Sequence, residues 1–181
     1  MDSTTGEFLQ CALKDVDWPG VGCPGTMRTP NLESYMKSII VRVNGILIED
    51  NKILLVEQDV SSNRHWAHPG GRPECGETLD QALVREMKEE TGLDVSIGRL
   101  LYVTDRIKDD NHVVIIGFRV TKEGGELGTG HGPEFERGKI KSVKMIPISE
   151  LRGLGFSENY CRLVEAGFSD QGTYIGNLLN D

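Results

Sequence analysis

The sequence lacks long hydrophobic runs, paired cysteines and an excess of basic residues. No stretch of about 18 apolar residues occurs in the chain, so no membrane-spanning helix is expected. The N-terminal segment also lacks the basic and apolar regions of a secretory signal. The absence of a CxxC pair argues against a structural zinc site. We therefore expect a cytoplasmic protein whose cysteines are free thiols, namely Cys11, Cys23, Cys75 and Cys161.

Acidic residues outnumber basic ones, with 28 Asp and Glu against 20 Lys and Arg, and give a formal net charge of −8. A long nucleic acid, which is held mainly by phosphate neutralisation, calls for a basic surface instead. The charge does not exclude small phosphorylated ligands, because a metal ion can lie between two anionic groups. At 38% hydrophobic and 27% charged residues, the composition is otherwise that of a globular protein.

The residue pattern divides the chain into three parts. Residues 1–35 contain several prolines and little periodicity, and are interpreted as a poorly patterned N-terminal extension. Residues 36–166 form the expected domain, and residues 167–181 a C-terminal tail with no assigned element. Apolar alternation and turn residues predict strands at 38–50, 51–59, 94–105, 112–121 and 140–147, and helices at 78–91, from Ser149 and at 157–166.

The predicted helix at 78–91 carries the most informative pattern. Thr78 and Gln81 form a capping box at its start, and Gly92 lies where a left-handed glycine ends many helices. At about 100° per residue, the apolar stripe of the first turns continues into carboxylates. The stripe consists of Leu79, Ala82 and Leu83, and the carboxylates that follow are Glu86, Glu89 and Glu90.

A run of charge usually marks a solvated helix face, but these carboxylates are poorly placed for that. Glu86 has like-charged neighbours at Glu89 and Glu90, and each such pair costs about 0.2–0.5 kcal/mol. They also lie at the C-terminal end of the helix, where the helix dipole disfavours anions. Carboxylate oxygens are the ligands that Mg²⁺ and Mn²⁺ prefer. The helix therefore favours a metal site over a solvated face.

The 23-residue run GRPECGETLDQALVREMKEETGL, from Gly71 to Leu93, resembles the Nudix box at every defined position. That pattern is Gly, five residues, Glu, seven residues, Arg-Glu, a bulky aliphatic, any residue, Glu-Glu, any residue, Gly and a bulky aliphatic. With Pro69-Gly70 before it and strands on both sides, the resemblance covers about 36–166. It implies an α/β fold, the Nudix-type α/β/α sandwich around a mixed β-sheet.

The resemblance also implies an activity, the hydrolysis of a diphosphate linked to a nucleoside. Phosphoryl transfer chiefly requires charge neutralisation and a positioned water. Glu86, Glu89 and Glu90 match the metal-binding carboxylates of the family, and Gly70 matches a glycine whose carbonyl also binds the metal. The implied cofactor is Mg²⁺, with Mn²⁺ as a substitute.

Two further box residues have roles implied by the resemblance. Glu77 matches the first box glutamate, which has an orienting role. Arg85 matches an arginine that pairs with a box glutamate, although it lies opposite the apolar stripe and an exposed side chain is the alternative.

The general base has two candidate locations. It is a box glutamate in some relatives, here Glu86, and a loop carboxylate in others. Many relatives carry a loop glutamate where this chain has Lys139. We therefore prefer Glu86, with Glu136 as the second choice among the loop carboxylates Glu126, Glu134 and Glu136.

Candidate substrate contacts lie beside the box. Arg72 would contact a phosphate or remain exposed, and Arg64 has the same alternatives. Trp66 would stack on a base or pack in the core. Cys75 occupies a variable box position and implies no thiol chemistry, and no ligand spacing relates His65, His68, His112 and His131.

The markers of the ADP-ribose, dinucleoside polyphosphate, NADH and coenzyme A branches are missing at their expected spacings. The MutT-like group, acting on nucleoside triphosphates or related compounds, remains. ADP-ribose or nucleotide-sugar pyrophosphatase is the alternative. A non-catalytic nucleotide-binding regulator is disfavoured because the box glutamates are present, and an RNA-end hydrolase because of the net charge. The expected partner is a small nucleotide, with no long nucleic acid and no membrane; a homodimer, frequent among relatives, stays open.

Overall fold

A computed structural model describes residues 39–59, 65–108, 111–128, 130–132, 139–169 and 172–177, with the backbone alone for 173–177. The predicted N-terminal extension lies outside the described residues. Within these ranges, the β-strands form two sheets, and two α-helices pack against them. No helix in the described part of the chain is long and apolar enough to cross a membrane.

The first sheet is mixed. Its strand order is β1-β6-β5-β8, in which β1 is parallel to β6, β6 antiparallel to β5, and β5 parallel to β8. These strands are β1 (Ile39–Ile46), β5 (Leu93–Lys108), β6 (Asn111–Gly125) and β8 (Thr173–Asn177).

The second sheet is antiparallel and centred on β3. Strand β3 pairs with β2, β4 and β7. The members are β2 (Ile48–Glu49), β3 (Lys52–Gln58), β4 (Trp66–Ala67) and β7 (Ile140–Pro147).

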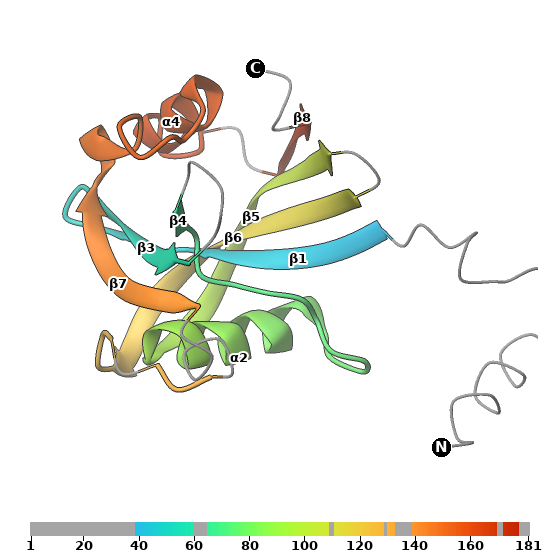
Figure 1. Ribbon diagram of the computed structural model, residues 1–181, viewed down its shortest axis with the longest axis vertical. Helices are drawn as coiled ribbons and strands as arrows, with labels where there is room; N and C mark the ends of the chain where they lie inside the picture. The colour runs from blue at the N-terminus through green and yellow to red at the C-terminus, as the bar shows by residue number, and fades with distance from the viewer. Residues whose placement is uncertain are drawn as a thin grey trace, which may run out of the picture. The chain divides into compact units, whose positions relative to one another are not determined.

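Helices α2 (Leu79–Thr91) and α4 (Glu158–Glu165) lie on opposite sides of the sheets (Figure 1). Each helix packs against its own buried hydrophobic cluster. Ala82, Leu83 and Met87 of α2 pack with residues such as Val43. On the other side, α4 packs with strand residues that include Ile53, Leu55 and Leu101. The predicted α/β/α arrangement around a mixed sheet is confirmed.

Local sequence signals explain the boundaries of α2. The side chain of Gln81 accepts a hydrogen bond from the Thr78 N–H at 3.0 Å, as the capping box predicts. Gly92 ends the helix with φ 80°, a conformation that costs glycine nothing, and its N–H donates to the Lys88 carbonyl.

The hairpin between β2 and β3 also follows its sequence signal. Asp50 and Asn51 adopt φ values of 47° and 59°, and the pair Glu49–Lys52 flanks them. Two consecutive left-handed residues are typical of the tight turn that suits the twist of paired strands.

The structure differs from the prediction in the C-terminal part. The helix expected from Ser149 is a single 3-10 turn, η2 (Ile148–Glu150). The tail contains β8, which the prediction missed, because its backbone pairs with the distant β5 and its short sequence shows no alternation. Strands β5 and β6 extend past the predicted 94–105 and 112–121, since pairing with shifts of register continues from Leu93–Gly125 to Lys108–Asn111.

Gly117→Ala is expected to lower the free energy of unfolding by about 1–3 kcal/mol, because it overpacks a buried site. A Cβ there would lie 2.4 Å from a ring carbon of Tyr102, which is buried. Urea denaturation measures the effect. Gly124→Ala on the same strand is the control, because its Cβ would meet nothing closer than 3.5 Å. Equal losses in the two variants would contradict the packing argument.

Candidate active site

The backbone of residues 69–71 runs along the edge of β1. The Val43 N–H donates to the Gly71 carbonyl and the Gly45 N–H to the Pro69 carbonyl, both at 2.9 Å. Gly70 has φ 142°, and a Cβ there would lie 2.0 Å from the Val43 carbonyl oxygen. Only glycine therefore allows this segment to lie so close to β1.

The same segment lies against the carboxylates of α2. A Cβ at Gly71 would lie 2.1 Å from Oε1 of Glu86, so the carboxylate occupies the space that any other residue would fill. The Gly70 N–H donates to Oε2 of Glu90 at 2.7 Å, and Glu90 is only 2% exposed. The glycines and the helix thus form one packed unit.

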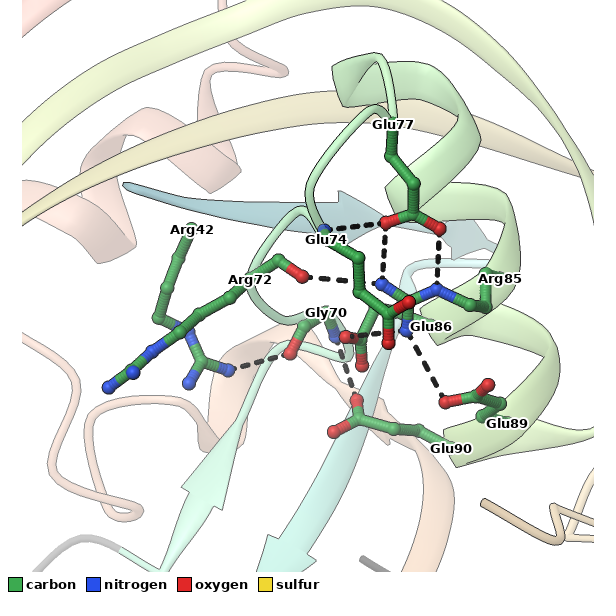
Figure 2. A network of polar contacts seen from close by, with 9 residues as sticks. All are labelled: Arg42, Gly70, Arg72, Glu74, Glu77, Arg85, Glu86, Glu89 and Glu90. Carbon is green, nitrogen blue, oxygen red and sulfur yellow. Dashed lines mark hydrogen bonds and ion pairs between the residues drawn. The ribbon is translucent and has the colours of Figure 1, made fainter. Parts of the chain in front are cut away.

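Arg85 lies at the centre of the acidic cluster (Figure 2). Its Nε and Nη2 each donate to a different oxygen of Glu77 at 2.8 Å, which forms a fork. Its Nη1 lies 3.0 Å from Glu86 and 3.4 Å from Glu89. Nη2 also donates to the Arg72 carbonyl at 3.2 Å. One guanidinium therefore joins the loop to the helix.

The electrostatics of the cluster follow from this arrangement. Arg85 and the Glu74 N–H hold the pKa of Glu77 at about 2. Burial raises the pKa of Glu86 above its ordinary value; Arg85 opposes this shift, and the neighbouring Glu89 adds to it. The carboxylates of Glu77, Glu86 and Glu89 therefore lie in one partly buried space around the guanidinium of Arg85.

A second loop meets the end of α2. The N–H groups of His131 and Gly132 both donate to the Glu89 carbonyl, at 3.0 and 3.2 Å. A Cβ at Gly132 would lie 2.6 Å from the Cβ of Glu89. This loop satisfies a carbonyl at the helix end and restricts the position of Glu89.

Comparison with known families decides the identity of this fold. The model of the NUDIX domain matches residues 39–162, which is more than half of the chain. The chain belongs to the Nudix family. Nudix hydrolases use divalent metal ions, which agrees with the acidic character of the site.

Curated relatives match about half of the chain. An "ADP-ribose pyrophosphatase" of Methanocaldococcus jannaschii is 45% identical over 93 residues, 50% of this chain and 55% of that protein. An "8-oxo-dGTP diphosphatase" of Proteus vulgaris is 32% identical over 93 residues, 50% of this chain and 83% of that protein. The match thus spans about half the length of the first relative.

Solved structures share the fold. A Nudix hydrolase from Nitrosomonas europaea aligns with TM-score 0.62 and 19% identity, over 76% of this chain and 94% of that one. A UDP-X diphosphatase aligns with TM-score 0.60 and 19% identity, over 95% of this chain and 76% of that one.

The Nudix carboxylates in this structure are satisfied by protein groups. Arg85 contacts Glu86 and Glu89, and Gly70 contacts Glu90. Within the described ranges, no three His, Cys, Asp or Glu side chains form a ready-made metal group. The donors nevertheless fit a hard cation, because the oxygens of Glu86 and Glu89 already converge on one positive atom, Nη1 of Arg85.

The remaining predicted residues that the structure describes do not place their side chains in the acidic cluster. Arg72 is exposed and contributes its carbonyl to Arg85. Trp66 is half-buried against the core, with Nζ of Lys144 5.6 Å from its ring centroid. Glu126 is exposed after β6. The other candidates, Arg64, Glu134 and Glu136, lie outside the described residues.

The histidines that lack ligand spacing make other contacts. His68 is buried, with Nε2 2.5 Å from the Tyr160 hydroxyl. Nε2 of His112 lies 2.6 Å from Asp105, on the first sheet.

Sequence reasoning missed Arg42. Its Nη2 donates to the Gly70 carbonyl at 2.6 Å, so it belongs to the site (Figure 2). The signal was a charged residue within the otherwise apolar run IIVRV. Gly132 was also missed, because nothing in the local pattern relates it to Glu89.

Glu77→Gln should make the stability of the protein less sensitive to acid. Because the folded-state pKa of Glu77 is lowered to about 2, its carboxylate contributes fully above the unfolded value of 4.5. That contribution is lost as the pH falls from 4.5 towards 2. Urea midpoints measured across this range should fall less steeply in Glu77→Gln than in the wild type.

Glu74→Gln is the control for that experiment, because its side chain makes no ion pair within the described residues of the same loop. If Glu77→Gln and the wild type lose stability in parallel, the Arg85 fork does not set the acid response.

Proposed function

We propose that this protein is a Nudix hydrolase that cleaves a diphosphate bond in a nucleoside di- or triphosphate derivative, as MutT-like pyrophosphohydrolases do. The observation that supports this most strongly is the packing of Glu86, Glu89 and Glu90 beside the Gly70–Gly71 backbone. Anionic side chains in a site for an anionic substrate require a cation between them.

The residues that would hold Mg²⁺ or Mn²⁺ are Glu86, Glu89, Glu90 and the carbonyl of Gly70. A bound divalent cation would neutralise phosphate oxygens and activate a water. Glu90 accepts the Gly70 N–H and so fixes the orientation of that peptide. Glu77 acts through Arg85, which its two oxygens hold in the cluster.

Glu86 is the proposed general base. Burial raises the pKa of this carboxyl group, and a higher pKa makes a carboxylate a stronger base. Its position beside Gly71 keeps it close to the proposed phosphate site. Glu136 remains the second choice.

The proposed substrate is a small nucleotide of the MutT-like type, as in the Proteus vulgaris relative named for 8-oxo-dGTP. ADP-ribose is the second candidate, and the 45% identity to the Methanocaldococcus jannaschii relative favours it. Arg72 and Trp66 are the proposed contacts to phosphate and base, since Arg72 is exposed beside the cluster and Trp66 is only partly buried.

Glu89→Gln should lower the rate of Mg²⁺-dependent release of phosphate or pyrophosphate by a factor of about 10² or more. The reason is that the site loses a charged ligand. Circular dichroism should show an unchanged fold, since Glu89 is partly exposed. Glu150→Gln, an exposed carboxylate at η2, is the matched control. Unchanged turnover in Glu89→Gln would overturn the metal assignment.

A substrate panel distinguishes the two candidates. Nucleoside triphosphates, 8-oxo-dGTP, ADP-ribose and a nucleotide sugar are incubated with Mg²⁺ or Mn²⁺, and product release is measured. The MutT-like proposal expects the triphosphates to have the highest kcat/KM, whereas higher values for ADP-ribose support the second candidate. Binding of a nucleotide without any turnover would instead indicate a non-catalytic regulator.

A further inference from the structure

Arg42 places a positive charge on the oxygen that the proposed metal would need. It extends from β1, is half-buried, and donates from Nη2 to the Gly70 carbonyl at 2.6 Å. Burial raises the pKa of Glu86, and the charge of Arg42 opposes that shift. Among the described residues, Arg42 makes no ion pair with a carboxylate. Within the described part of the chain, no single carboxylate therefore neutralises its guanidinium, which lies beside the acidic cluster.

The Gly70 carbonyl cannot readily serve Arg42 and a divalent cation together. Its oxygen has two lone pairs, so the conflict is electrostatic rather than geometric. A cation bound at about 2.1 Å from this oxygen would lie close to a guanidinium on the same atom, and like charges at such distances repel strongly. Binding of the cation therefore favours movement of Arg42 away from the carbonyl.

We propose that Arg42 is a phosphate-binding residue, held on the Gly70 carbonyl until a divalent cation takes that oxygen and then free to bind the diphosphate of the substrate. This inference rests on the proposed function of the same site. A guanidinium carries five N–H donors in a planar fork that matches phosphate oxygens, and Arg42 uses one of them on Gly70. A substrate diphosphate beside the Gly70 carbonyl would lie within reach of the others.

Arg119 makes the same kind of contact away from the acidic cluster. It is half-buried on β6 and donates from Nη2 to the Ile48 carbonyl at 2.7 Å. The contact is of the same kind as that of Arg42, but Ile48 lies in β2 and belongs to no carboxylate cluster. Arg119→Gln is therefore a matched control for Arg42→Gln.

The first measurement is Mn²⁺ binding without nucleotide, followed by electron paramagnetic resonance. Arg42→Gln should bind Mn²⁺ about three- to tenfold more tightly than the wild type, because the competing charge is gone. Arg42→Lys keeps the charge but has a shorter side chain without the fork, and should give an intermediate affinity. Arg119→Gln should match the wild type.

The second measurement is binding of α,β-methylene-ADP, which is not hydrolysed at the modified bond, with saturating Mn²⁺ by calorimetry. Arg42→Gln should bind it about tenfold more weakly, since a charged hydrogen-bond donor to phosphate is lost. Arg42→Lys should recover part of the affinity, and Arg119→Gln should again match the wild type. Neither measurement depends on turnover.

Opposite changes in the two affinities support the proposal, because misfolding would weaken both. Unchanged affinities in Arg42→Gln, weakening of both, or tighter Mn²⁺ binding with unchanged nucleotide binding would overturn it. If the wild type binds Mn²⁺ and Arg42→Gln behaves like it, the role of Arg42 fails while the metal site stands. If the wild type binds no Mn²⁺, the proposed function fails as well.

Discussion

The close approach of the 69–71 backbone to α2 is the constraint on which the acidic site depends. Gly71 leaves space only for the carboxylate of Glu86, and the Gly70 N–H fixes Glu90, which lies 20 residues further along the chain. Hydrogen bonds to β1 hold this backbone in place from the other side. Strand, glycines and helix are therefore one packed unit, and a side chain at either glycine would force the carboxylates or the strand to move.

That packing brings negatively charged side chains together. Two arginines from different elements lie beside them. Arg85 reaches Glu77, Glu86 and Glu89 from within α2, whereas Arg42 reaches the Gly70 carbonyl from β1. Burial still raises the pKa of Glu86, so the balance is incomplete. The net charge of −8 argued against a long nucleic acid. Located in this cluster, part of the acidity instead suits a cation and a small diphosphate.

Elements with strong local signals were predicted well. The capping box at Thr78, the left-handed Gly92 and the Asp50-Asn51 turn each act within a few residues, and the structure contains all three. Strand β8 was missed because it depends on pairing with β5, about 70 residues away, rather than on a pattern of its own. The helix expected from Ser149 reduces to one 3-10 turn, after which Leu151 and Phe156 enter the core.

The sequence by itself determined the helix, its acidic end and the family, because the box residues have fixed spacing along one element. Helical periodicity placed Arg85 opposite the apolar stripe, yet its guanidinium lies among the carboxylates, since a long side chain can turn back towards a loop. Only the tertiary structure decided that contact and the one between Arg42 and Gly70, which are 28 residues apart. Local patterns constrain backbone conformation, but a contact between distant residues is set by how strands and loops pack.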